Sequence, residues 1–398
     1  MTTAPQPTRF AVLGAAFLMA TSAIGPGFLT QTTTFTVALG ADLAFAILLS
    51  ILIDLGAQLN TWRVIGVSGK RGHELADAVL PGLGGLVAGV VIVGSFLFNL
   101  GNLSGCYQGL QVFGIHPIVG ILGSTLLVLV LFLNPKLMSG IGAFSIALGA
   151  GMILLTLYML GVTSPPYGEA LLRTVAPTRI DGDRTITLVG GTIGGYIMFS
   201  GAHGLLDSGV RGVENLGRIT WASIQGILIT GLMRAVLFLA ILGVVAGGAT
   251  LTGPRIVFDA FERAAGKPGL IVAGLVFWAA AITSVVGCSY TAVSFLVRTR
   301  GDAPSEPSRP ILIGFLLVGM LVAMVLYLAE VNAADVLIGA GRVNGFLLPI
   351  VLGVVLLAAH RPGLMGDYRH PKWATACGVL AWLATVYLAW ETVRKAFV

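Results

Sequence analysis

Apolar residues dominate this chain in eleven long stretches, each separated from the next by a connector that is richer in polar residues. A helix that crosses a bilayer needs about 20 mostly apolar residues, and every stretch is near or above that length. The stretches cover residues 10–40, 42–66, 84–111, 117–133, 138–162, 186–212, 219–248, 268–298, 310–331, 333–359 and 373–395. The pattern predicts an all-α integral membrane protein with eleven transmembrane helices in a single domain, residues 1–398.

The first stretch is interrupted at a depth that should lie inside the bilayer. Pro26 has no amide hydrogen and its ring clashes with the preceding turn, and the flanking Gly25 and Gly27 favour an open backbone. Unpaired backbone in hydrocarbon is costly, so a break here must be buried in protein or line a cavity. Discontinuous helices of this kind form substrate sites in transporters, although a proline kink can also serve packing alone.

The sixth stretch carries two glycine-rich segments. Gly190 and Gly194, and likewise Gly191 and Gly195, are four residues apart, a spacing typical of close helix–helix contact. The next segment, residues 200–204, reads Ser-Gly-Ala-His-Gly and is predicted to be a second break at bilayer depth. Interrupted helices at corresponding positions of two halves indicate an inverted repeat with a transport site between the halves.

Composition and charge support a membrane protein and narrow its partners. The chain is 56% hydrophobic and 10% charged, whereas a soluble domain carries about 25% charged residues. The net charge of +6 follows from membrane topology and does not indicate a nucleic-acid partner. Lys and Arg are more frequent in the connectors that would lie on the same side of the membrane as the N-terminus than in those on the other side. This bias predicts a multi-pass protein of the plasma (inner) membrane, surrounded by lipid. Its N-terminus would be cytoplasmic and its C-terminus outside.

Three ionisable residues inside the predicted spans are candidates for coupling or gating. His203 and Asp207 are four residues apart and share one helix face, so they could exchange a proton during transport or form a structural pair. Arg342 lies within the tenth stretch, where an arginine faces a cavity or a partner. It could counter a substrate carboxylate or Asp207, or extend to the membrane interface.

Four further polar residues lie within the spans. Asn99 and Asn102 are three residues apart on one helix face, where they could bridge helices or line a pathway. Asp54 and Arg234 could pair with each other, and a structural pair is the favoured interpretation.

The chain has no HExxH, GxSxG or Walker motif, so no enzymatic activity and no cofactor are predicted. A membrane sensor or a non-transporting scaffold is the rival from another class.

The two interrupted stretches resemble those of the natural resistance-associated macrophage protein (Nramp) family. Residues 25–28 align with that family's Asp-Pro-Gly-Asn motif, and residues 198–200 align with its Met-Pro-His motif. The acidic pair of the third family helix falls on Asn99 and Asn102. The resemblance implies the LeuT-type fold, with helices 1 and 6 broken. Its inverted repeat of five plus five helices would comprise residues 10–162 and 186–359, followed by an extra helix at residues 373–395.

The chain departs from the family at the metal ligands. Both ligand side chains of the first motif and the histidine of the second are replaced, and both acids of the third helix are amides. A transition metal needs charged or soft ligands, and only the Met198 sulfur survives. No metal site is therefore predicted, although divalent Mg²⁺ or Mn²⁺ held by carbonyls, Met198 and water is the alternative.

Helix N-termini at two breaks would favour a carboxylate. The expected cargo of this secondary-active carrier is therefore a small organic acid or amino acid, such as 5-oxoproline, moved by alternating access. The coupling ion is left open between H⁺ and Na⁺. The predicted substrate-binding residues are Gly25, Gly27, Phe28, Thr30, Gln31, Thr32, Met198, Ser200, Gly201 and Ala202.

Overall fold

The computed structural model describes residues 19–20, 22–134, 150–297 and 308–396, and within these ranges the secondary structure is helical, with no strand. The labelled helices are α2 (Pro26–Leu39), α3 (Leu43–Ser68), α4 (Gly72–Val79), α5 (Leu83–Gln111), α6 (Pro117–Leu133), α8 (Tyr167–Val175), α9 (Gly182–Ile193), α10 (Ile197–Asp207), α11 (Leu216–Ala246), α12 (Ile256–Ser294), α13 (Arg309–Leu328), α14 (Ala333–Ala358), α15 (Pro362–Met365) and α16 (Lys372–Ala396), with 3₁₀ turns η1 (Gly40–Asp42) and η2 (Val213–Asn215).

The predicted spans are confirmed where the structure describes them. Eight helical segments are long and apolar enough to cross a membrane, and Pro117–Leu133 and Ala150–Val162 are shorter apolar helices. The segment Pro26–Ser68 holds the end of the first predicted span and all of the second, because the chain turns at η1 between them. The start of the first span, residues 10–18, and residues 138–149 of the fifth lie outside the described residues.

The first break lies where the sequence predicts it. The helical turn at Ser22 and Ala23 stops, and Gly25 is extended with φ −105° and ψ −173°. Helix α2 then begins at Pro26, whose missing N–H costs no hydrogen bond at this first helical position. The hydroxyl-rich run after the break forms the middle of α2.

The prediction of the second break was wrong in position. Helix α9 ends at Ile193 and α10 begins at Ile197, so the break comprises residues 194–196 and the segment 200–204 lies inside α10. Gly195 has φ +55°, and a Cβ there would lie 2.3 Å from the Asn344 side-chain oxygen. Of the four glycines predicted to make helix contacts, Gly190 and Gly191 do so within α9, whereas Gly194 and Gly195 belong to the break, where Asn344 of α14 fills the space left by their missing side chains.

The eighth predicted span is preceded by additional helix. Helix α12 starts at Ile256 rather than at residue 268, and it bends at Gly266, which has φ +63°. The part before Gly266 covers one end of the bundle, and the part after it crosses the bundle.

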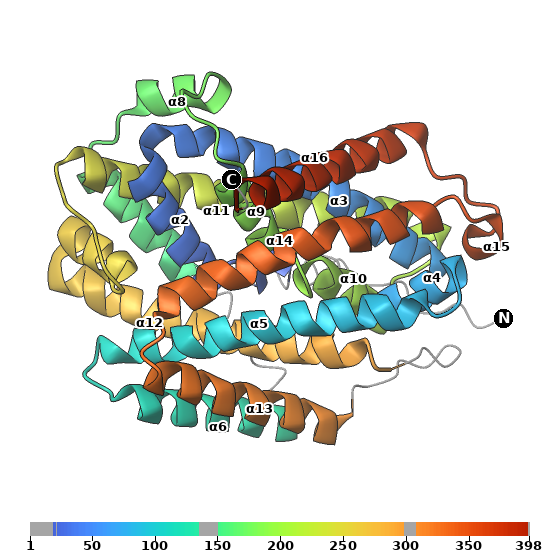
Figure 1. The fold of residues 1–398 in the computed structure, drawn as a ribbon, viewed down its shortest axis with the longest axis horizontal. Helices are drawn as coiled ribbons and strands as arrows, with labels where there is room; N and C mark the ends of the chain where they lie inside the picture. Colours follow the sequence, from blue (N-terminus) through green and yellow to red (C-terminus); the bar gives the residue numbers. More distant parts are fainter. Residues whose placement is uncertain (1–18, 21, 135–149, 298–307, 397–398) are drawn as a thin grey trace.

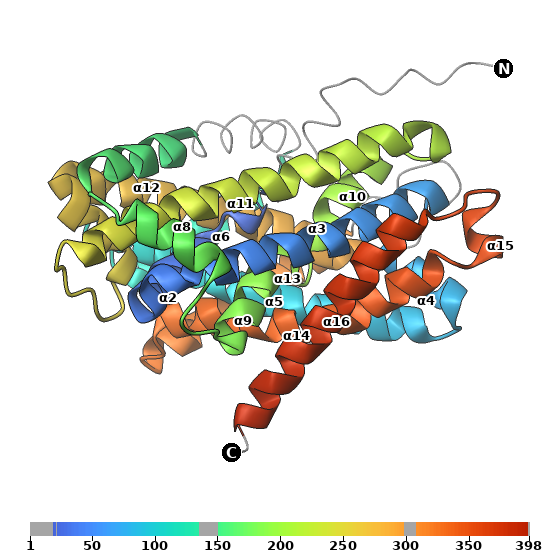
Figure 2. The same ribbon diagram turned by 90° about the horizontal axis from the view of Figure 1, so that it is seen from above.

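The broken helices occupy the middle of the molecule. Helix α2 contacts α11, α12 and α14, while α9 contacts α14 and α3, and α10 contacts α3 and α12. Helices α6 and α13 pack outside α5 (Figure 1), and α16 crosses the bundle obliquely (Figure 2). The long helices run along one axis, with α8 and the start of α12 at one end and α4 and α15 at the other (Figure 1). These ends are called the α8 end and the α4 end; which one faces the cytoplasm stays a prediction.

Candidate functional site

The two breaks meet directly at the centre of the bundle. The Tyr196 hydroxyl, in the second break, donates to the Ser22 carbonyl beside the first break at 3.2 Å. A Cβ on Gly25 would lie 2.7 Å from the Ser284 hydroxyl of α12 and 3.6 Å from the Asn102 side-chain oxygen of α5. Gly25, Asn102, Tyr196, Ser284 and the Ser22 carbonyl are called the break cluster, and only glycine at position 25 allows this approach.

The break cluster contains polar atoms that the protein does not satisfy. Asn102 Nδ2 and Ser284 Oγ are buried beside the Tyr196 hydroxyl, and neither atom meets the geometry of a hydrogen bond within the protein. Leaving such a group unpaired costs about 1–3 kcal/mol, which a polar ligand bound between them would recover. Helix α2 also starts here, and the first N–H groups of a helix have no intrahelical acceptor. The cluster can therefore offer hydrogen bonds to a small polar solute.

Gln31 lies in a narrow slot between three helices. Its side chain is fully buried on α2, with Nε2 at 3.5 Å from the Leu337 carbonyl of α14 and Oε1 without a partner. A Cβ at Gly191 of α9 would lie 2.3 Å from Oε1, and one at Gly341 of α14 would lie 2.2 Å from Nε2. The small residues on both sides let this carboxamide occupy the space between α9 and α14.

The remaining predicted residues of α2 have structural contacts. The Phe28 ring lies under the Arg234 guanidinium, with Cζ 4.4 Å from the ring centroid. Thr32 donates to the Phe28 carbonyl at 2.7 Å, and Thr30 is buried in the same helix. A Cβ on Gly27 would make ordinary contact with the Leu337 carbonyl at 3.7 Å.

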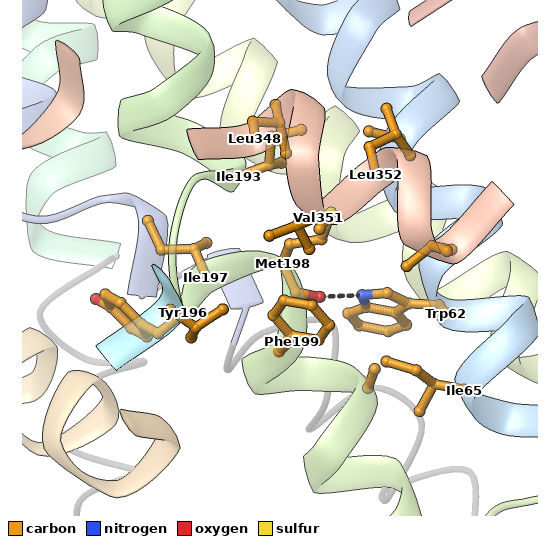
Figure 3. Close-up of a cluster of buried hydrophobic side chains, with 14 of the residues drawn as sticks. Trp62, Ile65, Ile193, Tyr196, Ile197, Met198, Phe199, Leu348, Val351 and Leu352 are labelled. Atoms are coloured by element: carbon orange, nitrogen blue, oxygen red, sulfur yellow. Dashed lines mark hydrogen bonds between the residues drawn. The ribbon is translucent and has the colours of Figure 1, made fainter. Parts of the chain in front are cut away.

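The predicted residues of α10 lie in its interface with α3 (Figure 3). Trp62 Nε1 donates to the Met198 carbonyl at 3.0 Å, and the Thr61 hydroxyl, which donates to the Ala57 carbonyl at 2.9 Å, lies 3.2 Å from the Met198 sulfur. The Ser200 hydroxyl donates to the Ile197 carbonyl within the helix at 2.9 Å. Ser200, like the nearby Gly201 and Ala202, is buried in α10, so this half of the predicted site is packed against α3.

Asn99 and Asn102 have different surroundings, although they share one helix face. Asn102 belongs to the break cluster, whereas Asn99 Nδ2 would lie 2.5 Å from a Cβ on Gly319 of α13. Both side-chain polar atoms of Asn99 are buried without a hydrogen-bond partner. Asn99 therefore packs between α5 and α13 without a hydrogen bond across them, and Asn102 lies beside the first break.

His203 and Asp207, for which a structural pair was one of two alternatives, each bind other elements at the α4 end. Asp207 accepts a hydrogen bond from Arg71 Nη2 at 2.7 Å. The Gly72 amide donates to His203 Nε2 at 3.3 Å, and Nδ1 lies 3.1 Å from the Ser294 hydroxyl. Since Nε2 must accept, Nδ1 carries the proton and the imidazole is neutral. These bonds fasten α10 to the start of α4 and to α12.

Aromatic rings complete this closure of the α4 end. Phe199 and Phe295 lie edge to face with centroids 4.9 Å apart, and the His203 and His73 rings lie 5.2 and 5.7 Å from Phe295. These rings and the Arg71–Asp207 pair are called the α4-end seal. The seal packs α10 against α4 and α12 at this end.

At the α8 end, the structure has an open cavity of about 600 Å³. It is lined by Thr34, Phe35, Arg179, Ile180, Asp181, Asp183, Arg184, Asp335, Ile338, Arg342 and Lys395. Of the three alternatives for Arg342, pairing with Asp207 does not occur in this structure, because Arg342 forms an ion pair with Asp183 of α9 in the cavity wall. The Arg342 side chain is 48% exposed, so this pair is accessible to water.

Sequence reasoning missed three residues of the central region, namely Tyr196, Ser284 and Asn344. Asn344 Nδ2 donates to the Gly94 carbonyl at 3.0 Å and holds α14 against α5 at the second break. The Gly-Gly-Tyr sequence at 194–196 was the available signal for this break. Ser284 and Asn344 carry no local signal, since their positions become informative only when the helices are assembled.

The donor set at the breaks is made of neutral groups. The cluster presents an amide, two hydroxyls and a main-chain carbonyl, which suit hydrogen bonding better than tight coordination of a transition metal. In the described part of the chain, no group of three or more His, Cys, Asp or Glu side chains is arranged to hold a metal ion.

Comparisons with known proteins extend over nearly the whole chain. It is 47% identical over 370 residues to the uncharacterized membrane protein YcsG of Bacillus subtilis (strain 168), covering 93% of this chain and 90% of the relative. It is 44% identical over 382 residues to an uncharacterized membrane protein of Haemophilus influenzae, covering 96% and 94%.

Two solved structures share the fold. The manganese transporter of Eremococcus coleocola, in complex with an aromatic bis-isothiourea substituted compound, matches with a TM-score of 0.74 and 15% identity over 99% of this chain and 88% of that one. MhsT in complex with L-phenylalanine matches with a TM-score of 0.67 and 15% identity over 96% and 98%. Both likenesses support the membrane-transporter fold of LeuT type.

A family model described as natural resistance-associated macrophage protein-like matches residues 16–394. The match includes both breaks and every described helix that contacts them. The chain therefore belongs to the Nramp family, whose members are membrane transporters and not enzymes.

Proposed function

We propose that this membrane transporter is a secondary-active carrier of a small carboxylate-bearing solute, an organic acid or an amino acid, which binds at the break cluster. The observation that carries the proposal is the start of α2 beside two buried, unpartnered polar atoms, Asn102 Nδ2 and Ser284 Oγ. A helix N-terminus attracts a carboxylate, and hydrogen-bond donors beside it can orient the rest of the solute.

Alternating access is supported by the difference between the two ends. The cavity at the α8 end reaches Thr34 on α2, whereas the cavity of about 480 Å³ at the α4 end is lined by residues of the α3–α4 connector and of the segment after α10, and the α4-end seal lies at the side chains of α10. Release toward the α4 end would require α10 to leave Arg71 and Gly72. The second break, just before α10, provides a point at which this helix can move.

A divalent cation, Mg²⁺ or Mn²⁺, is the second candidate cargo. It is favoured by the fold that this chain shares with the manganese transporter of Eremococcus coleocola. In this chain a cation would have to use the Ser22 carbonyl and the Asn102 and Ser284 oxygens, together with water. Both candidates therefore place the cargo at the same cluster and differ in its chemistry.

A binding screen with one matched pair of variants tests the proposal. Purified protein is screened by thermal shift against organic acids and amino acids, including 5-oxoproline, and against MnCl₂ and MgCl₂. Ser284→Ala should weaken binding of an acid by roughly tenfold, the worth of one hydrogen bond to a charged group. Ser223→Ala is the control, because Ser223 Oγ is also buried and unpartnered but lies between α11 and α3.

The outcomes separate the candidates. Stabilisation by an acid that is lost in Ser284→Ala and kept in Ser223→Ala supports the carboxylate carrier. Stabilisation by MnCl₂ or MgCl₂ alone replaces it with the cation carrier. An acid that binds both variants as well as it binds the wild type contradicts the assignment of the break cluster.

A further inference from the structure

A second cavity at the α8 end shares no residue with the break cluster or with the cavity around Arg342. It has a volume of about 690 Å³ and lies between the end of α5, the start of α12 and the connector from α13 to α14. Sites for small molecules have volumes of about 300–1,000 Å³ and combine apolar walls with a few polar groups. This cavity is called the connector pocket, and its walls include Tyr107, Gln108, Arg255, Phe258, Tyr327 and Glu330.

Two polar side chains in the pocket wall are buried and leave hydrogen-bonding atoms free for a ligand. Tyr107 is 7% exposed and Gln108 is 8% exposed. Gln108 Nε2 donates to the Pro254 carbonyl at 3.4 Å, which fixes the carboxamide at the wall. Within the described part of the chain, neither Gln108 Oε1 nor the Tyr107 hydroxyl has a hydrogen-bond partner. A polar ligand would recover the free energy that these two unpaired groups cost.

Arg255 and Glu330 place opposite charges on two walls of the pocket. Arg255 directly precedes α12, and Glu330 follows the end of α13. In the ranges that the structure describes, neither side chain forms an ion pair, although both line the same pocket. A simple anion would be attracted by Arg255 and repelled by Glu330, and a simple cation the reverse. A zwitterion satisfies both charges at once, so the pocket favours an ammonium and a carboxylate in one molecule.

Glu330 occupies a backbone position that usually belongs to glycine. Its φ is +57°, and among the described residues it is the one non-glycine with positive φ. The Glu330 N–H donates to the Tyr327 carbonyl at 3.0 Å, in the turn that ends α13. Glycine is usual at this place after a helix, because a side chain makes the left-handed backbone costly. The chain keeps a carboxylate here despite that cost, which supports a role for the side chain in the pocket.

Aromatic rings separate the connector pocket from the first break. Phe258, in the pocket wall, packs on Phe277 with ring centroids 5.0 Å apart. A Cβ on Gly105 of α5 would lie 3.4 Å from the Phe277 ring and 2.5 Å from the Pro26 ring. Phe258 and Phe277 therefore lie between the pocket and the start of α2, and a ligand in the pocket would not contact the break cluster.

We propose that the connector pocket is a second ligand site, which binds a zwitterionic amino acid with an apolar side chain. Arg255 binds its carboxylate and Glu330 binds its ammonium, while the Tyr107 hydroxyl and the Gln108 carboxamide supply further hydrogen bonds. The apolar side chain packs on the Tyr107 and Tyr327 rings, which lie edge to face with centroids 5.5 Å apart. The inference is independent of the proposed function, because the pocket binds its ligand whatever cargo the break cluster carries.

The first experiment tests the requirement for both charges by isothermal titration calorimetry of the purified full-length chain. L-Phenylalanine, L-leucine and L-proline are the zwitterionic probes. N-Acetyl-L-phenylalanine lacks the ammonium and L-phenylalaninamide lacks the carboxylate, and each should bind at least about fivefold more weakly than L-phenylalanine. Either of these two compounds binding as tightly as L-phenylalanine would overturn the proposal. So would the absence of binding by all three amino acids at concentrations up to about 10 mM, which would reveal a dissociation constant near 1 mM.

The second experiment assigns the binding to the pocket with charge-matched variants. Arg255→Gln and Glu330→Gln should each weaken binding of L-phenylalanine by about five- to tenfold. Arg263→Gln and Glu262→Gln are the controls, because they remove the same charges from α12 outside the pocket and should leave the affinity unchanged. Affinities of Arg255→Gln and Glu330→Gln that equal that of the wild type contradict the assignment.

Two further variants distinguish ligand binding from stability and from the break cluster. Glycine adopts positive φ without steric cost, so Glu330→Gly should melt no lower than the wild type and yet bind as weakly as Glu330→Gln. Ser284→Ala should keep the binding that Arg255→Gln loses. Binding that is lost in Ser284→Ala but kept in Arg255→Gln and Glu330→Gln would place the amino acid at the break cluster, which supports the proposed function and overturns the connector pocket.

Discussion

Replacing Asp207 with asparagine should loosen the α4-end seal, because it removes the charge that holds Arg71. The Arg71 and Asp207 side chains are only 3% and 22% exposed, so water screens their 2.7 Å contact weakly. A hydrogen bond between charged groups contributes about 1.5–3 kcal/mol. The lower half of this range applies, because the side-chain oxygen of asparagine can still accept a hydrogen bond from Arg71. The opening equilibrium of the α4 end should then rise by roughly 10- to 30-fold.

Hydrogen–deuterium exchange of the protein in detergent or nanodiscs measures this opening. Peptides from α10 and α4 should exchange faster in Asp207→Asn by the same factor, since exchange of protected amides follows local opening. Asp183→Asn is the matched control, because it breaks the pair with Arg342, which is 48% exposed, at the α8 end. An exposed pair contributes about 0–1 kcal/mol, and α10 should not respond. Exchange of α10 in Asp207→Asn that stays within about twofold of wild type would refute the seal.

Two further predictions concern packing and pH. Gly191→Ala would place a Cβ 2.3 Å from the Gln31 side chain. This overlap should lower the free energy of unfolding, measured by chemical denaturation, by about 1–3 kcal/mol. The double variant Gly191→Ala/Gln31→Ala should recover part of the lost stability, because the side chain that clashes has been removed. Burial and the nearby Arg63 lower the pKa of His370, in the connector before α16, to about 4. Because the unfolded chain binds the proton at higher pH than the folded chain, stability should be full above about pH 6.5 and fall toward pH 4. In His370→Gln, the loss of stability between about pH 6.5 and about pH 4 should be smaller than in the wild type by about 1–2 kcal/mol, after allowance for the exposed part of the ring. Thermal shift measured across this pH range tests it, and plots of melting temperature against pH that run parallel for the two proteins would contradict it.

The apolar pattern predicted the spans well because the bilayer sets their length and composition. It placed the ends of α6 at the residues where the structure has them, and those of α5 and α14 within one residue. It missed the part of α12 before Gly266, since a helix that covers the end of the bundle does not need to be apolar throughout. Local composition thus predicted which segments form helices, but it did not predict how far a helix continues outside the membrane.

The candidate site was only half predictable, and the reason is visible at the second break. The sequence contains two glycine clusters, and we assigned residues 194–195 to helix contact and placed the break at residues 200–204. The decision depends on Asn344 of α14, whose side chain fills the space at Gly195 and whose Nδ2 binds the Gly94 carbonyl. At the first break, Pro26 settled the position locally because it lacks an N–H. Tertiary contacts from distant helices therefore account for the residues that sequence reasoning missed.

The second break separates the contacts that hold α9 from the contacts that hold α10. Helix α9 is bound at the α8 end by the Asp183–Arg342 pair, and α10 is bound at the α4 end by Arg71. Between them, residues 194–196 form no helix, so a rotation of α10 need not be transmitted rigidly to α9. The α4 end can then open while the Asp183–Arg342 contact persists. A continuous helix through the same residues would instead transmit any rotation of α10 to α9 and to the Asp183–Arg342 contact.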